Sequence, residues 1–275
     1  MTGERFEVDG LAAVRWGEGG PAYLLLHAGV ADSRSWEAVA PALDGPAVAY
    51  DRRGFGGSSP GPEGFRHVDD LLAVLGAAGA SGPVWLVGNS MGGALAIDAA
   101  LEAPERFAGL VLIGPGVSGD VPGWEEPPTT AAEQRWEAAW KAAGEDDVEE
   151  RLRLDAWLWL DGPEHEGRVG GAARELALDM NRRVFAHGAP DEAGANGIDG
   201  GGRLGVLTLP VTVAWGELEN SEQAAICELL VERIPGARRV ILPGTAHLPG
   251  LDAPDALIAA IREARAAGRT PPAAR

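Results

Sequence analysis

The chain has 275 residues, a length that suits one large α/β domain or a domain that carries a sizeable insertion. Apolar residues make up 45% of it and charged residues 23%, which argues against a disordered chain. The formal net charge of -18 would repel nucleic acid and anionic membrane surfaces, so neither is expected as a partner.

The first part of the chain predicts alternating strands and helices. Two short strands flank Asp9-Gly10, which is a hairpin signal. Continuous apolar runs closed by glycine follow, and these are typical of strands buried on both faces. The predicted strands cover 22–29, 47–50, 83–90 and 108–116, and the predicted helices cover 67–79, ended by Gly79, and 91–103, ended by Pro104.

The pattern changes between residues 117 and 205. This segment contains five tryptophans and several runs of charged residues, and we expect it to be helical. Its tryptophans either line an apolar cavity or pack helices together. The alternation then returns with strands at 209–217 and 237–244 and helices at 221–234 and 253–267. The helix at 221–234 contains Cys227, which we expect to be buried.

This order predicts an α/β fold in which helices flank a mostly parallel central sheet. We expect residues 1–116 and 206–275 to form the core and residues 117–205 to form a helical cap, or lid. Ligands of such sheets bind beyond the carboxyl ends of the strands, and the cap is expected there. Cys227 is the single cysteine, which excludes an internal disulfide and a multi-cysteine metal site.

One serine stands between glycines where a strand becomes a helix. Gly88-Asn89-Ser90-Met91-Gly92 fits the pattern G-x-S-x-G. Glycines on both sides allow a sharp turn, and the turn holds the hydroxyl clear of the sheet at the positive end of the next helix. The arrangement indicates a nucleophile whose attack creates an oxyanion, although a tight turn that needs small residues would give the same pattern.

A serine nucleophile needs a base, and five histidines are available. His247 is favoured, because it follows the last predicted strand in a loop shaped by glycine and proline and can reach over the strand ends. The other four have simpler expectations: His27 braces a loop, and His165 and His187 are solvated in the insertion. His67 begins a helix, where it is expected to be a surface residue or a partner in the cap region.

The base in turn needs an acid that fixes its tautomer. Glu217 and Glu219 follow one strand of the second half, and Asp120 follows a strand of the first half. Each of these carboxylates could instead be an ordinary surface group on an acidic protein, so the residues alone leave the three alternatives open.

At this point the chain resembles the α/β-hydrolase family. The order serine, acid, histidine is the order of that family, with the nucleophile on the strand-to-helix turn. Further stretches resemble the family's motifs: LLLHAGVADSRSW, YDRRGFGGSS, APERFAGLVLIGP and ARRVILPGTAHLPGLDAPD. Together they run from about residue 20 to residue 265 and leave only the insertion without a family pattern.

The resemblance implies Ser90 as the nucleophile, His247 as the general base and Glu219 as the acid, three residues after Gly216. Aspartate is commoner at that position, so the loop or the histidine must shift slightly to accept the longer side chain. The resemblance also implies an oxyanion hole made by the backbone N–H groups of Met91 and Gly29. Members of the family usually have His-Gly before the second donor, whereas this chain has His27-Ala28.

These residues predict a serine hydrolase that cleaves a small or medium, largely apolar ester, lactone or thioester through an acyl-enzyme. The alternatives are a non-hydrolytic enzyme of the same fold, such as a carbon–carbon lyase or cyclase, and a catalytically inactive ligand-binding member. We expect no metal or other cofactor. No export signal or membrane-spanning run is present, so we expect a cytoplasmic protein. The sequence is compatible with a monomer and with a homo-oligomer.

Overall fold

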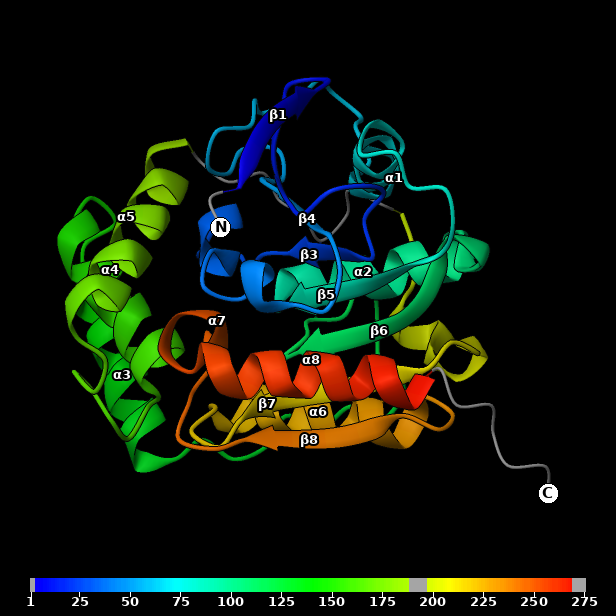
Figure 1. The fold of residues 1–275 in the computed structure, drawn as a ribbon. Coiled ribbons are helices and arrows are strands. Elements are labelled where there is room, and N and C mark those ends of the chain that lie inside the picture. The colour runs from blue at the N-terminus through cyan, green and yellow to red at the C-terminus, as the bar shows by residue number, and fades with distance from the viewer. Residues whose placement is uncertain (1–2, 188–196, 269–275) are drawn as a thin grey trace.

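A single eight-stranded sheet organises the protein (Figure 1). The computed structural model describes residues 3–187 and 197–268. The strand order is β1-β2-β4-β3-β5-β6-β7-β8; β2 runs antiparallel to both β1 and β4, and the pairs from β4 to β8 are parallel. The strands are β1 Glu4–Val8, β2 Leu11–Trp16, β3 Tyr23–Leu26, β4 Ala47–Tyr50, β5 Val84–Asn89, β6 Phe107–Ile113, β7 Val211–Gly216 and β8 Arg238–Leu242.

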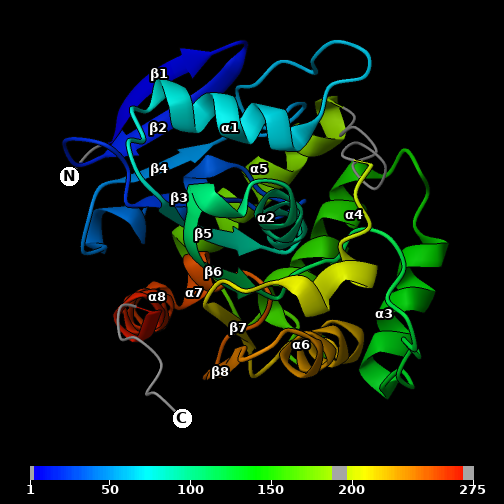
Figure 2. The ribbon, with the colours of Figure 1, turned by 90° about the vertical axis from the view of Figure 1, so that its right-hand side faces the viewer.

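Helices cover both faces of this sheet, as Figure 2 shows. Side chains of a strand alternate between the two faces, so Leu24 and Leu26 of β3 join one core cluster while Tyr23 and Leu25 join the other. Because both of their faces are buried, the central strands β3 to β7 read as nearly continuous apolar runs, unlike the exposed edge strands β1 and β8. The first cluster is covered by α1 His67–Ala77, α2 Met91–Glu102 and α6 Ser221–Arg233, and the second by α8 Pro254–Gly268 and the 3-10 turns Ser33–Trp36 and Ala40–Ala42.

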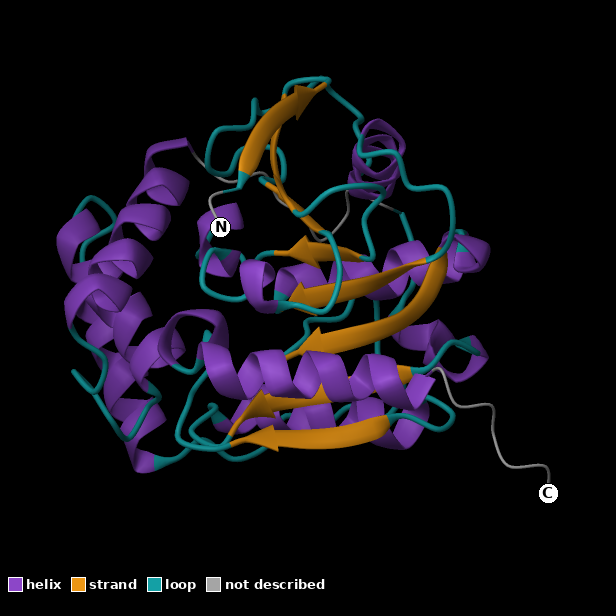
Figure 3. Ribbon diagram, in the orientation of Figure 1, coloured by secondary structure: helices purple, strands orange, loops and turns teal. Residues whose placement is uncertain are grey.

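The helical segment between β6 and β7 lies at the end toward which the parallel strands point (Figure 3). It contains α3 Ala131–Ala142, α4 Val148–Asp155, the π-helical segment Ala156–Asp161 and α5 Gly171–His187. Helices therefore make up much of the described part of this segment, although residues 117–130 contain none. Residues 188–196 of the predicted cap lie outside the described residues, and its limits at 117 and 205 remain a prediction. Leu204, near the second limit, packs in the core cluster beside α2.

Two short helical segments lie near the candidate site. One is the π-helical segment, which continues α4, and the other is α7 Pro249–Asp252, which directly follows the loop of His247 and was not predicted from the sequence. Both begin or end beside the strand ends where the candidate site lies. Within residues 3–187 and 197–268, no helix combines the length and the apolar character needed to cross a membrane.

Candidate active site

Ser90 occupies a strained turn between β5 and α2. Its φ of 56° and ψ of -119° place a non-glycine residue in a region that L-amino acids rarely adopt. The flanking glycines are required by packing: a Cβ on Gly88 would lie 2.3 Å from the Gly92 carbonyl oxygen, and a Cβ on Gly92 would lie 2.4 Å from the Leu26 carbonyl oxygen. The G-x-S-x-G pattern is thus explained by a turn that only these residue types permit.

Backbone hydrogen bonds fix the Ser90 turn from two sides. The Ser90 N–H donates to the Ile113 carbonyl at 2.9 Å, and the Gly116 N–H donates to the Ser90 carbonyl at 2.9 Å. Strand β6 therefore holds the turn in place. Met91 is the first residue of α2, and N–H groups in a first helical turn have no partner within their own helix.

His247 and Glu219 form a buried pair. Nδ1 of His247 lies 2.8 Å from Oε2 of Glu219, and the two side chains are 2% and 1% exposed. The other carboxylate oxygen of Glu219 accepts hydrogen bonds from the backbone N–H and the side-chain amide of Asn220, at 3.2 and 3.1 Å. With its second oxygen held in this way, the Glu219 carboxylate keeps one fixed direction toward the imidazole.

The two alternative acids lie elsewhere. Glu217 is exposed, and its carboxylate accepts a hydrogen bond from the backbone N–H of Gly244 at 3.0 Å. Asp120 is exposed in the loop that follows β6. Of the three candidates, the structure therefore brings Glu219 to His247.

Asn89 links the Ser90 turn to the histidine loop. Its side-chain amide donates to the carbonyl of Ile113 at 2.9 Å and to the carbonyl of His247 at 3.1 Å. Gly114, which follows β6, lies against both members of the His247–Glu219 pair. A Cβ on Gly114 would lie 2.9 Å from Nδ1 of His247 and 3.1 Å from Oε2 of Glu219. Ser90, His247 and Glu219 thus gather around the end of β6. No sequence pattern pointed to this contact of Asn89.

Gly29 and Met91, the residues of the predicted oxyanion hole, are in contact through the Met91 side chain. A Cβ on Gly29 would lie 2.3 Å from the sulfur of Met91, so the loop after β3 touches a side chain from the start of α2. His27 braces this loop as expected: its Nδ1 lies 2.8 Å from the Ala28 carbonyl, and its Nε2 accepts the Arg52 N–H at 3.0 Å. Complete burial, and then the charge of Arg52, keep the pKa of His27 well below its usual value.

The remaining histidines do not reach the site. His165 and His187 are exposed, in agreement with the sequence. The surface position expected for His67 is wrong, because its side chain is only 2% exposed and its ring meets Phe65 edge-on at 4.9 Å. Burial, and then the charges of Arg52 and Arg53, lower the pKa of His67 to about 3. A buried imidazole beside two guanidinium groups stays neutral.

Trp159, which belongs to the π-helical segment, lies over the candidate site. Its ring centroid lies 4.7 Å from that of His247, with an interplanar angle of 47°. Trp136 and Trp140 instead stack on each other at 5.4 Å. Trp136 also joins two helices, because its indole N–H donates to the Leu154 carbonyl of α4 at 2.8 Å.

A cavity of about 200 Å³ opens beside Trp159 and next to the Glu219 loop. Burial, and then the nearby carboxylates of Glu126 and Glu133, raise the pKa of Glu222 in its wall. Among the described residues, no group of three or more histidine, cysteine, aspartate or glutamate side chains is arranged to hold a metal ion. The cavity combines apolar and acidic walls: Pro127, Trp136, Leu158 and Trp159 with Glu126, Glu133, Glu137 and Glu222.

Comparisons with known proteins find enzymes among the relatives of this chain. The chain is 34% identical over 113 residues to an esterase of Mycobacterium tuberculosis, a match that spans 40% of this chain and 38% of the esterase. It is 28% identical over 255 residues to a 2-succinyl-6-hydroxy-2,4-cyclohexadiene-1-carboxylate synthase of an Enterobacter species, covering 89% of this chain and 92% of the synthase.

Among solved structures, the fold is similar to that of a thermophilic esterase from Thermogutta terrifontis. The TM-score is 0.75 at 24% identity, over 98% of this chain and all of the other, and this likeness concerns the fold. The family model described as the alpha/beta hydrolase family matches residues 23–260, which is most of the chain. The protein therefore belongs to the alpha/beta hydrolase family.

Proposed function

We propose that the protein is a serine hydrolase that cleaves a carboxylic ester, lactone or thioester through an acyl-enzyme. The observation that carries the proposal is the buried hydrogen bond between His247 and Glu219, beside a serine held at a φ of 56°. A base fixed by a carboxylate and a nucleophile on a strained turn are the elements that this chemistry requires.

In the proposed mechanism, His247 removes the proton of the Ser90 hydroxyl while the oxygen attacks the substrate carbonyl. Glu219, at 2.8 Å from Nδ1, holds the imidazole with Nε2 free for this proton and stabilises the imidazolium that forms. His247 then gives the proton to the leaving alcohol or thiol. A water molecule, activated by the same base, releases the acyl group from Ser90.

The negative charge of the tetrahedral intermediate falls on the former carbonyl oxygen. In the proposal, the N–H groups of Met91 and Gly29 stabilise it. The position of Met91 at the start of α2 supports this role, because its N–H has no helical partner and lies at the positive end of the helix dipole. The contact between Gly29 and the Met91 side chain supports the second donor.

We propose that the substrate is uncharged, small to medium in size and largely apolar. The cavity of about 200 Å³ beside Trp159 lies below the usual range for ligand pockets, roughly 300–1,000 Å³. Trp136 and Leu158 give it apolar walls, while the glutamates in the same walls would repel an anionic acyl chain. Two methyl esters of equal chain length, one ended by a methyl group and one by a carboxylate, test this preference: the neutral ester should be hydrolysed faster.

Labelling with a fluorophosphonate tests the proposed function. The reagent should modify Ser90 in the wild type and leave Ser90→Ala untouched, and Ser90→Ala should lose about a thousandfold or more of the esterase activity. A wild-type protein that is not labelled, or a Ser90→Ala variant that keeps its turnover, contradicts the proposal and favours a ligand-binding member of the family.

A second candidate function is a non-hydrolytic reaction at the same site. The relative at 28% identity that is named a synthase favours it, since its match covers 92% of that protein. Both candidates need Ser90 and His247, so labelling does not separate them. Turnover in ¹⁸O-labelled water does: a hydrolase places the label in the acid product, whereas a lyase or cyclase leaves it in the solvent.

A further inference from the structure

The imidazole of His247 is held at its edge by one hydrogen bond, from Nδ1 to Glu219. A single bond of this kind leaves the side chain some rotation about its Cβ–Cγ bond, and that rotation changes the direction of Nε2. A second contact on the ring restricts this rotation. Trp159 provides such a contact, with its ring centroid 4.7 Å from that of the imidazole and the two rings tilted at 47°.

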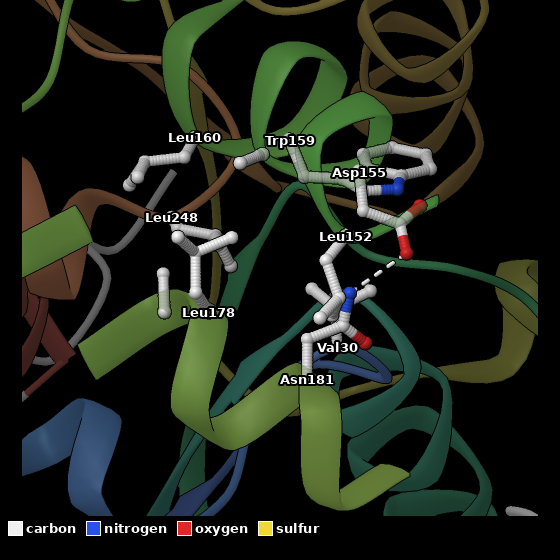
Figure 4. Close-up of a pocket in the computed structure, with 10 residues that line it drawn as sticks. Val30, Leu152, Asp155, Trp159, Leu160, Leu178, Asn181 and Leu248 are labelled. Carbon is white, nitrogen blue, oxygen red and sulfur yellow. Dashed lines mark hydrogen bonds between the residues drawn. The ribbon is translucent and has the colours of Figure 1, made fainter. Parts of the chain in front are cut away.

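Trp159 is itself anchored within the helical segment. The indole of Trp159 lies beside Asp155, one helical turn earlier (Figure 4). The Asp155 carboxylate accepts a hydrogen bond, at 2.7 Å, from the side-chain amide of Asn181 on α5. Asp155 therefore links the helical turn that carries Trp159 to α5.

Asp155 lies in unusual surroundings for a carboxylate. It is 9% exposed and lines a cavity of about 10 Å³, room for about one water molecule. Val30 and Leu248, the neighbours of Gly29 and His247, line the same cavity. Burial raises the pKa of Asp155 to about 6, partly offset by Asn181, by Trp159 and by the charge of Arg151. A buried carboxylate is costly, and its bond to Asn181 and its place beside the indole offset part of that cost.

We propose that Trp159, anchored by Asp155 and Asn181, is a positioning residue that holds the His247 imidazole in the orientation needed to reach Ser90. The role rests on the proposed function, because it concerns the proton transfer between those two residues. Trp159 acts through the ring of His247, and Asp155 acts through Trp159.

The test measures the rate constant of Ser90 labelling by a small fluorophosphonate, and kcat for a neutral ester, in full-length variants. Trp159→Leu should lower both about tenfold, since a small misplacement of a catalytic group is costly. Trp159→Phe keeps an aromatic face and should recover most of the loss. Trp140→Leu is the matched control: its tryptophan stacks on Trp136, away from His247, and both rates should stay at the wild-type value.

A double-mutant cycle tests the route from Asp155. Asp155→Leu should slow labelling severalfold in the wild-type background and cause no further loss in Trp159→Leu, since coupled residues are not additive. If Asp155→Leu does not fold, Asn181→Leu takes its place in the cycle. Equal labelling rates for Trp159→Leu and Trp140→Leu, or fully additive effects in the cycle, overturn this role while the proposed function stands. A wild type that is not labelled overturns the proposed function itself.

Discussion

The side-chain amide of Asn89 donates a hydrogen bond to the backbone carbonyl of His247 at 3.1 Å, across 158 positions of the sequence. The same amide nitrogen donates to Ile113 at 2.9 Å, so one buried side chain joins β5, β6 and the histidine loop. Asn89, the residue before the proposed nucleophile, therefore ties the backbone of the proposed base to β6, without touching its ring in either bond.

Asn89→Asp tests this connection with almost no change of shape. A carboxylate cannot donate, and it would face two carbonyl oxygens in a buried position, so we expect a loss of about 3 kcal/mol in the free energy of unfolding. Displacement of the histidine loop should also lower kcat about tenfold. Chemical denaturation and ester turnover measure the two effects. A variant with wild-type stability and kcat would show that neither bond matters.

Replacement of Glu219 tests the acid. Glu219→Gln removes the charge that stabilises the imidazolium and allows the wrong tautomer of His247, so kcat/KM should fall about a thousandfold or more. Glu219→Asp keeps the charge but shortens the side chain by one methylene, and about a tenfold loss is expected.

Glu217→Gln is the control for this pair, because its side chain is exposed and can still accept the Gly244 N–H. It should hydrolyse a neutral ester at the wild-type rate. If Glu217→Gln and Glu219→Gln lost equal activity, the assignment of Glu219 as the acid would be wrong.

The contrast between Ser90 and Asn89 shows which parts of the site are readable from sequence. The elbow of Ser90 is local: glycines at 88 and 92 and an apolar run before them are enough to predict it. The contact of Asn89 depends on where a loop 158 residues later comes to lie, and no local pattern encodes that. The central strands were also predictable from a local pattern, since burial on both faces leaves an apolar run in the sequence.

The helical segment was readable only in outline. Charged runs and tryptophans indicated helices, but they did not show which ring would reach the base. Trp159 contacts His247 because a π-helical segment, which has no sequence signature here, continues α4 and ends beside the strand ends. The prediction of a surface position for His67 is wrong because a position at a helix start is ordinary for a surface residue and carries no sign of burial. Its burial comes from tertiary packing against Phe65 and beside Arg52.

The buried His67 predicts a dependence of stability on pH. Its pKa is about 3 in the folded protein against an ordinary value of 6.5, so below pH 6.5 the unfolded chain binds a proton that the folded protein does not. The contribution is complete above pH 6.5 and is lost on acidification, by about 1.4 kcal/mol per pH unit. Between pH 6.5 and 5 the wild type should lose about 2 kcal/mol more than His67→Gln.

Chemical denaturation at several pH values measures this difference. His165→Gln is the matched control, since His165 is exposed, and its stability should follow the wild type across the range. Parallel curves for the wild type and His67→Gln would mean that His67 is protonated in the folded protein as readily as in the unfolded chain.

Two glycine-to-alanine changes should have opposite signs. A Cβ on Gly88 would lie 2.3 Å from a backbone oxygen of α2, which cannot move aside without displacing the elbow, so Gly88→Ala should cost about 3 kcal/mol or more. Gly76 is exposed near the end of α1, and a Cβ there would meet nothing within 4 Å beyond its own helix and chain neighbours. Gly76→Ala should therefore gain about 0.5–1 kcal/mol of helix stability.

Thermal unfolding separates the two glycine variants, and labelling connects them to the site. Because the turn at Ser90 depends on Gly88, Gly88→Ala should also lose fluorophosphonate labelling, whereas Gly76→Ala should label at the wild-type rate. A Gly88→Ala protein that labels normally would show that the elbow tolerates a side chain there, and the strained turn would then not explain why glycine precedes the nucleophile.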